Sequence, residues 1–278
     1  MPLTNSKVSK DSPSWWGEHH FELNELKTWR FRERYFSIKR TENEWTVSNK
    51  ETQKEEECVI QLDSKPQDNS DSNQQEFLQG VSNQRFMLGK TKPSLFIEPS
   101  LADRAMIARP STALNVLPGE SVTFFVSSPL WFTIYLSQEE TPLSDLPFWR
   151  PSDSWFGPST MQGDLCYAKF TDAKTEFAQL DRRENRALTR VTITNEQDTT
   201  LAVQRINLPV PKLKLYHDSD KQFWTDDVNI LQQMEHNQAV SSVKHTPPLP
   251  ATDYVLVSES RELSKKSSLF TTIKSLIA

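Results

Sequence analysis

The chain has 278 residues, and its 32 Lys and Arg against 37 Asp and Glu give a formal net charge of −5. Its six glycines, about 2% of the chain against a usual ~7%, never form G-x-G, which excludes glycine-rich loops for phosphates and dinucleotides. Two cysteines exclude a disulfide framework and a four-thiolate zinc site. An acidic chain without a concentrated basic stretch also predicts no nucleic-acid partner.

The compartment is predicted from hydropathy along the chain. The first eleven residues are polar and lack the apolar core of a signal peptide. No window approaches eighteen consecutive apolar residues. The sequence therefore predicts a cytoplasmic protein with no transmembrane segment.

Short apolar and polar alternations recur from end to end and predict β-strands throughout. The expected strands lie at 34–40, 44–48, 58–62, 85–89, 94–98, 114–117, 121–127, 131–136, 165–171, 187–195, 200–208 and 254–258. Two connections look like hairpin turns, Pro118-Gly119 and the polar run at 195–198. The pattern is typical of a mostly β, antiparallel, sandwich-like fold of one or two domains.

Composition suggests where the domains divide. We expect a disordered tail at 1–14, an N-terminal β unit at 15–100 and a larger β-sandwich-like domain at 101–260. The stretch 63–76 has no apolar residue and predicts a flexible loop inside the first unit.

Helical spacing occurs in two places. Residues 226–240 carry Val228, Leu231 and Met234 at near-helical intervals. The region 261–278 predicts an amphipathic tail helix. Its apolar stripe contains five residues, Leu269, Phe270, Ile273, Leu276 and Ile277. The stripe packs on its own sandwich, docks on a partner or lies on a membrane surface, and the sequence leaves these alternatives open.

Several motifs resemble one family. They are WWG at 15–17, FIEPSLADR at 96–104, LPGESV at 117–122, SPLW at 128–131, DSWFGP at 153–158, GDLCYA at 163–168 and LPVPKL at 208–213. On these motifs the chain resembles the prokaryotic family called domain of unknown function four-three-two, from Trp15 to about Ser258. The resemblance implies no activity. Members of this family are sometimes encoded beside small-conductance mechanosensitive channels, so the resemblance implies an accessory role near the inner membrane with such a channel as partner.

Tests for catalytic chemistry are mostly negative. The five histidines form neither H-E-x-x-H nor H-x-H, and we expect no metal site and no cofactor. Cys166 lies in an apolar strand pattern typical of a buried thiol. Asp145, Asp153 and Asp164 flank loop tryptophans, as in a sugar-processing cleft, although loop aspartates are also common turn formers.

The loop aromatics are the most informative feature. Trp149, Trp155 and Phe156 lie in a proline-rich segment, where an aromatic residue either wedges the structure or forms a platform for a ligand. Gly157 is expected to supply a backbone angle that other residues avoid.

The function favoured by these observations is that of a non-catalytic, cytoplasmic interaction or accessory protein, peripheral to the inner membrane. The candidate contact residues are Trp149, Asp153, Trp155, Phe156 and Asp164, with the five apolar tail residues as a second contact. Two alternatives stay open: a carbohydrate-binding or carbohydrate-active β-sandwich, and a self-assembling structural subunit of an oligomer.

Overall fold

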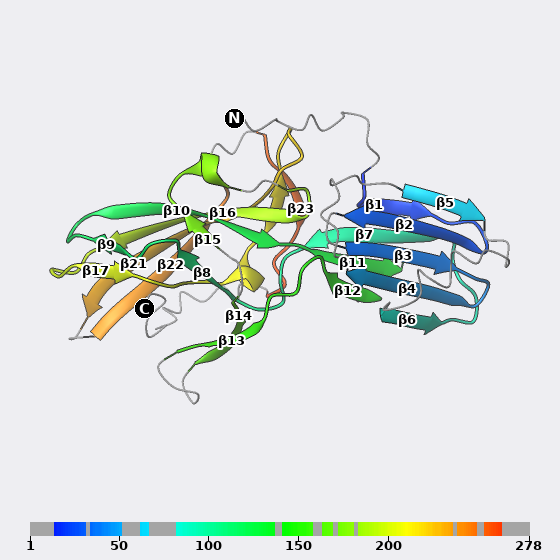
Figure 1. Ribbon diagram of the computed structural model, residues 1–278, viewed down its shortest axis with the longest axis horizontal. Helices are drawn as coiled ribbons and strands as arrows, with labels where there is room; N and C mark the ends of the chain where they lie inside the picture. The colour runs from blue at the N-terminus through cyan, green and yellow to red at the C-terminus, as the bar shows by residue number, and fades with distance from the viewer. Residues whose placement is uncertain are drawn as a thin grey trace. The chain divides into compact units, whose positions relative to one another are not determined.

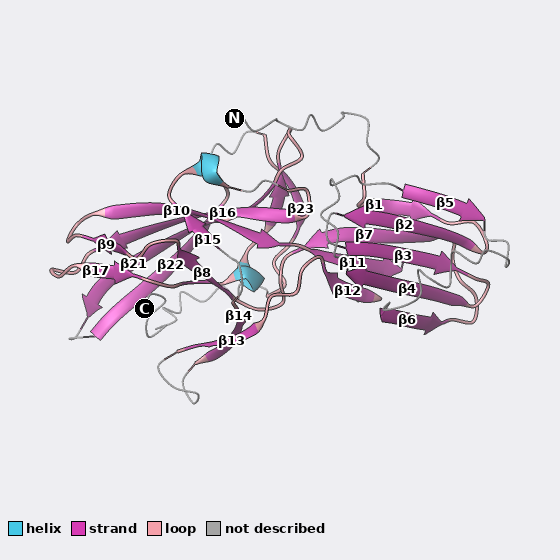
Figure 2. Cartoon of the chain, in the orientation of Figure 1, coloured by secondary structure: helices cyan, strands magenta, loops and turns pink. Residues whose placement is uncertain are grey.

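The structure is a computed structural model that describes residues 14–31, 34–51, 62–66, 82–136, 141–157, 163–168, 172–180, 183–235, 238–248 and 253–262. Within these ranges the chain forms 23 β-strands and two short 3-10 helices, η1 (Phe177–Gln179) and η2 (Val210–Lys212). Strands dominate the described chain (Figure 2), which confirms the prediction of a mostly β fold.

The strands belong to two compact units. Unit 1 comprises Met1–Glu98 and Phe132–Leu146, and unit 2 comprises Pro99–Trp131 and Pro147–Ala278. The sequence suggested a single boundary near residue 100, and the structure differs because Phe132–Leu146 belongs to unit 1. Residues 94–100 pair with residues 131–136, and pairing between strands so far apart in the sequence leaves no local signal.

Unit 1 consists of a five-stranded and a four-stranded sheet (Figure 1). The five-stranded sheet is antiparallel and runs in the order β5 (Leu62–Pro66), β2 (Glu25–Phe31), β3 (Arg34–Arg40), β4 (Glu44–Glu51), β6 (Ser82–Met87). The four-stranded sheet runs in the order β1 (Gly17–His20), β7 (Ser94–Ser100), β11 (Trp131–Leu136), β12 (Ser144–Pro147).

Aromatic rings join the two sheets of unit 1. Phe132 of β11 stacks on Phe36 of β3 with 4.5 Å between ring centroids, and it lies edge-on to Trp29 of β2 at 5.6 Å. All three side chains are fully buried. Aromatic pairs of this kind contribute about 0.5–1.5 kcal/mol each beyond the burial of their area. The two sheets of unit 1 therefore form a sandwich-like arrangement, whereas the sequence predicted the sandwich-like domain at 101–260.

Unit 2 is organised around a twelve-stranded sheet. Its main path is β13 (Asp153–Phe156), β14 (Asp164–Tyr167), β8 (Met106–Pro110), β15 (Asp172–Lys174), β10 (Ser121–Pro129), β16 (Arg186–Asn195), β20 (Phe223–Thr225), β19 (Leu215–His217), β23 (Val255–Ser258). Off this path, β18 (Ile206–Leu208) pairs with β8, and β21 (Asp227–Glu235) pairs with β16 and β22 (Gln238–Thr246). Most pairs are antiparallel, as predicted, but β14–β8, β15–β8, β16–β20 and β16–β21 are parallel.

The predicted turn at Pro118-Gly119 is present, but neither predicted connection closes a simple hairpin. Glu120 N donates to Leu117 O at 3.1 Å, and Gly119 has φ 77°, as a type II turn requires. The strand before this turn, β9 (Leu114–Val116), nevertheless pairs with β17 (Leu201–Val203) instead of β10. The buried Asn195 side chain ties this ribbon together by donating to Val116 O and Thr199 O.

The spacing at 226–240 indicated a helix, and that prediction is wrong. The structure has the antiparallel hairpin of β21 and β22 there. Every second side chain of β21 is buried, at Val228, Ile230 and Gln232, and the residues between them are only half-buried. Burial therefore repeats every two residues, as in a strand.

Several expectations concern residues outside the described part of the chain. These are the tail at 1–13, the loop residues 67–76 and the tail helix from 263 onward, including Leu269, Phe270, Ile273, Leu276 and Ile277. The start of the predicted flexible loop, 63–66, is not a loop, because it pairs with β2 as strand β5.

Candidate functional site

The hairpin of β13 and β14 carries most of the predicted site residues. Its register sets Asp153 opposite Tyr167 and Trp155 opposite Leu165. Side chains alternate between the two faces of a strand, so these four residues share one face. We call this set, with the neighbouring Arg104 and Arg150, the hairpin face.

The opposite side of the hairpin packs against the rest of unit 2. Phe156 and Cys166 are buried there against Ile107 of β8. The guanidinium of Arg205 lies 5.5 Å from the centre of the Phe156 ring. Burial, with a smaller contribution from Asp164, raises the pKa of the Cys166 thiol. The thiol is therefore buried and protonated, as the sequence pattern indicated, and it is unsuited to nucleophilic attack.

Two large apolar side chains remain exposed on the hairpin face. Trp155 is 38% exposed and its cross-strand neighbour Leu165 is 48% exposed. The Trp155 indole lies across Gly163, where a Cβ would approach the indole nitrogen more closely than real Cβ atoms do and would lie 2.6 Å from Phe156 O. Glycine at 163 therefore leaves the space that the indole occupies. Gly157, which follows β13, has φ 150° and confirms the predicted need for glycine there.

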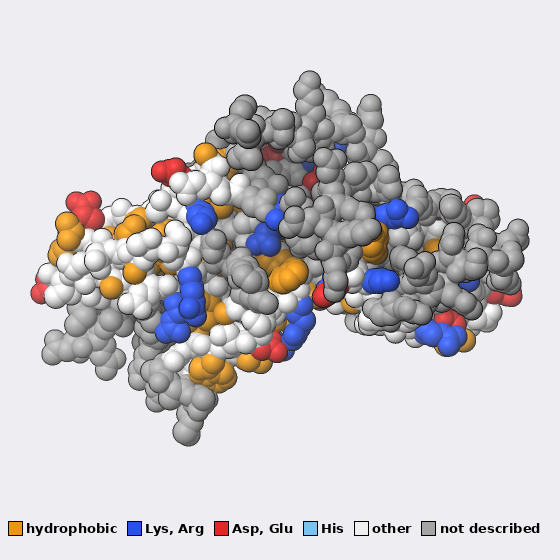
Figure 3. Space-filling model, viewed as in Figure 1, with side chains coloured by type: hydrophobic (Ala, Val, Ile, Leu, Met, Phe, Trp, Pro, Cys, Tyr) orange, Lys and Arg blue, Asp and Glu red, His pale blue; other side chains and the backbone are white. Residues whose placement is uncertain are grey.

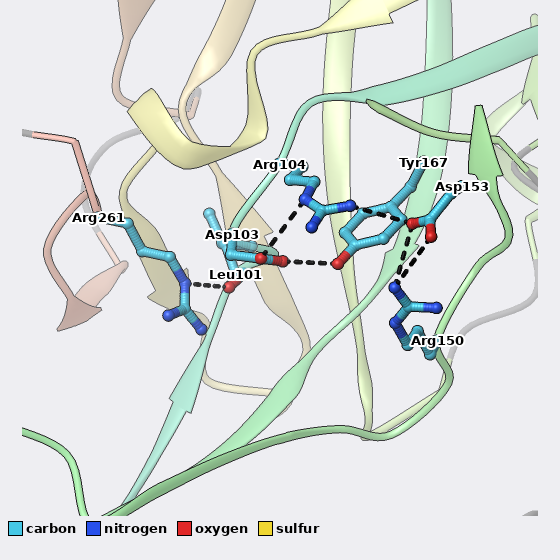
Figure 4. A network of polar contacts seen from close by, with 7 residues as sticks. All are labelled: Leu101, Asp103, Arg104, Arg150, Asp153, Tyr167 and Arg261. Carbon is cyan, nitrogen blue, oxygen red and sulfur yellow. Dashed lines mark hydrogen bonds and ion pairs between the residues drawn. The ribbon is translucent and has the colours of Figure 1, made fainter. Parts of the chain in front are cut away.

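Polar contacts fix this hairpin to neighbouring loops (Figure 4). Asp153 accepts from Arg104 Nη1 at 3.0 Å and from Arg150 Nη2 at 3.1 and 3.2 Å. Tyr167 donates its hydroxyl proton to Asp103 Oδ1 at 2.8 Å. Nearby, Arg261 Nε donates to the backbone oxygen of Leu101 at 2.6 Å.

Tyr167 lies at the centre of this network. The guanidinium carbons of Arg104 and Arg150 lie 5.3 and 5.7 Å from the centre of its ring, which is within range for cation–π attraction. Burial, followed by the contact with Asp103, raises the pKa of Tyr167. Its hydroxyl therefore stays protonated and serves as a hydrogen-bond donor. Each exposed ion pair alone contributes only about 0.2–1 kcal/mol, but the shared partners restrict several loops together.

The structure separates the predicted contact residues into three groups. Asp153 and Trp155 lie on the hairpin face, whereas Phe156 and Asp164 lie on its opposite side. Trp149 is half-buried, and its indole nitrogen is buried with no hydrogen-bond partner in the described part of the chain.

Asp153 and Asp164 do not form an acid–base pair. Asp153 and Asp164 point to opposite sides of the hairpin. Asp145 belongs to unit 1, where it accepts a hydrogen bond from Thr133 at 2.8 Å. Hydrolysis of a glycosidic bond needs two carboxyl groups on either side of one bond, and Asp153 and Asp164 do not provide that arrangement.

Sequence reasoning missed four members of the hairpin face as site residues: Arg104, Arg150, Leu165 and Tyr167. The alternation of Leu165 and Tyr167 was visible as a strand. The pairing of this strand with β13 was not predicted, so the sequence did not predict that residues of the two strands share the hairpin face. Arg104 is 49 residues from Asp153, and no local pattern signals such a contact.

Two features are absent from the described residues. They contain no group of three or more His, Cys, Asp or Glu side chains arranged to hold a metal ion. They also contain no helix that is long and apolar enough to cross a membrane.

Comparisons with known proteins agree with the resemblance seen in the motifs. Residues 15–277 match the model of a family described as protein of unknown function (DUF432). A search of curated proteins and a search of solved structures each found no match. Because the family model covers nearly the whole chain, from the WWG motif through both units, this protein belongs to the DUF432 family.

Proposed function

We propose that this protein is a non-catalytic interaction module that binds a protein partner through the hairpin face. The observation that carries the proposal is the pair of exposed apolar side chains, Trp155 and Leu165, on a hairpin fixed by the Asp153 and Tyr167 contacts. Fixing a binding surface in advance reduces the entropy lost on association. Trp, Tyr and Arg are also the residues most enriched at the energetic centres of protein interfaces.

The expected energy of this surface follows from its exposed area. An indole presents up to ~250 Å², so covering the exposed 38% of Trp155 removes about 95 Å² from water. At ~25 cal/mol per Å² this contributes about 2 kcal/mol, or about 30-fold in Kd. Covering the exposed half of Leu165 adds about 1 kcal/mol.

The test is affinity capture from native lysate with the tagged full-length chain, its Trp155→Ala variant and a matched control. Phe96→Ala is the control, because Phe96 in unit 1 is 40% exposed and lies off the hairpin face. We expect a defined set of proteins to be lost with Trp155→Ala and retained with Phe96→Ala. Recovery of the same proteins with both variants would contradict the proposal.

The partner that the family resemblance implies is a mechanosensitive-type channel complex, and we propose a location peripheral to the inner membrane. The proposed second contact, the apolar tail stripe, lies outside the described residues. Deletion of residues 267–278 tests it, since the deletion is expected to reduce recovery in the membrane fraction.

Carbohydrate binding is the alternative that the flat, exposed indole of Trp155 favours, because sugars stack on such platforms. Glycan-array binding by the wild type that is absent with Trp155→Ala would favour this alternative over a protein partner. Sedimentation measures self-assembly directly and tests the structural-subunit alternative.

A further inference from the structure

The chain that follows β23 has a defined direction. Strand β23 pairs antiparallel with β19, and beyond it Glu259 Oε2 lies 2.9 Å from Lys214 Nζ. The backbone nitrogen of Glu262 then donates to Pro211 O at 2.9 Å. The chain therefore runs antiparallel to residues 211–217 and away from the start of β23.

This direction ends beside the polar network of the hairpin face. Arg261 Nε donates to Leu101 O at 2.6 Å, two residues before Asp103. Asp103 accepts the hydroxyl proton of Tyr167, and Figure 4 shows Asp103 between Arg261 and Tyr167. Residues 263–278, which lie outside the described part of the chain, therefore begin next to the hairpin face.

The hairpin face and this segment both carry apolar residues. Trp155 is 38% exposed and Leu165 is 48% exposed. Figure 3 shows hydrophobic side chains at the surface over the part of unit 2 where β13 and β14 lie. The segment carries the predicted five-residue apolar stripe at 269–277, and the DUF432 model matches as far as residue 277 and so includes it. Covering the exposed pair with the stripe removes apolar area of both from water, which is favourable.

The stripe is within reach of the exposed pair. Residues 263–269 span up to about 23 Å when extended, at ~3.3 Å per residue. Leu165 lies two residues from Tyr167 on β14, a separation of about 7 Å. The chain from Glu262 to the stripe is therefore long enough to place the stripe on the hairpin face.

We infer that residues 263–278 of the same chain cover the hairpin face when no partner is bound, with the stripe on Trp155 and Leu165. This inference rests on the proposed function, because it makes the partner-binding face one that the chain itself occupies. A tethered segment with a short linker has an effective concentration in the millimolar range, so a contact with a Kd of about 0.1 mM is occupied about ten to one. A partner for the same face then binds about tenfold more weakly than it would to the open face.

The contact couples the two proposed binding surfaces. The stripe does not cover the hairpin face and contact a membrane or a channel at the same time. Binding of the stripe elsewhere therefore opens the hairpin face, and a partner on the hairpin face releases the stripe to the same extent, because such coupling is reciprocal.

The test is photo-crosslinking within the purified full-length chain. A photoreactive phenylalanine analogue replaces Leu165, the protein is irradiated at low concentration, and the crosslinked residues are identified by mass spectrometry after proteolysis. We expect a crosslinked monomer in which position 165 is joined to residues 269–277. The control carries the analogue at Leu117, which is 58% exposed in unit 2 and lies off the hairpin face, and it should give no crosslink to these residues.

Two full-length variants test the stripe itself. Ile273→Asp places a charge in the stripe, and Thr271→Asp places the same charge two residues away, on the other side of an ideal helix. We expect Ile273→Asp to lower the crosslink yield about tenfold, because burying an unpaired charge in the contact is costly. Without the analogue, the same variant should shift the indole N–H resonance of Trp155, and Thr271→Asp should do neither. If the analogue at position 165 prevents folding, the resonance decides the test.

The inference is overturned if Ile273→Asp leaves the Trp155 resonance unmoved and position 165 gives no crosslink to the stripe. A crosslinked dimer would also overturn it, because the occupant would then be a second copy of the chain. If Trp155→Ala loses captured proteins but no crosslink to the stripe forms, the proposed function stands without this inference. If the crosslink forms but Trp155→Ala loses no captured protein, the stripe contact is real and the partner-binding role fails.

Discussion

Replacing Gly163 by Ala tests how the hairpin face is built. An added Cβ would overlap the Trp155 indole nitrogen and lie 2.6 Å from the Phe156 carbonyl oxygen, which is backbone and cannot rotate away. Overpacking of this kind costs about 1–3 kcal/mol. At about 2 kcal/mol, the melting temperature of a unit of this size should fall by about 4–8 °C.

The matched control is Gly89→Ala, because a Cβ at Gly89 meets no atom within 4 Å. At such an open site the substitution is neutral or stabilises by up to about 1 kcal/mol, through the unfolded chain. The assay is thermal unfolding of both variants, with the indole N–H resonance of Trp155 recorded and assigned through Trp155→Phe. We expect a lower melting temperature and a shifted Trp155 resonance for Gly163→Ala alone. Equal melting temperatures with an unmoved resonance would refute the close approach of the indole to Gly163.

Three further predictions concern the framework. Phe132→Ala should destabilise unit 1 by about 3–5 kcal/mol in denaturant unfolding, because it leaves a cavity against Phe36; a loss below 1 kcal/mol would contradict the sandwich core. The bond from Arg85 lowers the pKa of Glu44 to about 2, so its stabilising contribution is present above pH 4.5 and is lost as the pH falls toward 2. Glu44→Gln should therefore lower the melting temperature at pH 7 and not at pH 2, and an equal effect at both would refute the pairing. Asn195→Ala leaves two backbone carbonyls without their donor and should cost about 1–3 kcal/mol of unfolding free energy, whereas no change would refute its role in holding the β9–β17 ribbon.

The fold was predictable where alternation is local and strict. The strands at 34–40 and 131–136 were predicted with the same bounds that the structure has. The error at 226–240 arose because Leu231 and Met234 are apolar at near-helical intervals, while the polar Gln232 is one of the buried side chains. A buried polar residue hides the period of two from a pattern based on hydrophobicity.

The candidate site was predictable only in part, because strand alternation and contacts between distant segments decide which residues share a face. Trp155 and Asp153 stood out by residue type and loop context, and the structure places both on the hairpin face. Phe156 stood out for the same reason, but strand alternation turns it inward. The contribution of Arg104 depends on a contact between separate segments, and such contacts depend on the tertiary fold.

The most direct test of the hairpin face as a binding surface is site-specific photo-crosslinking in cells. A photoreactive phenylalanine analogue replaces Leu165, which is 48% exposed beside Trp155, and in a second strain it replaces Phe96 of unit 1. We expect light-dependent crosslinking of one discrete protein at position 165, none of it at position 96, and loss of the product when Trp155→Ala is added. The same crosslinked product from both positions, or none at position 165, would contradict a partner-binding role for this surface.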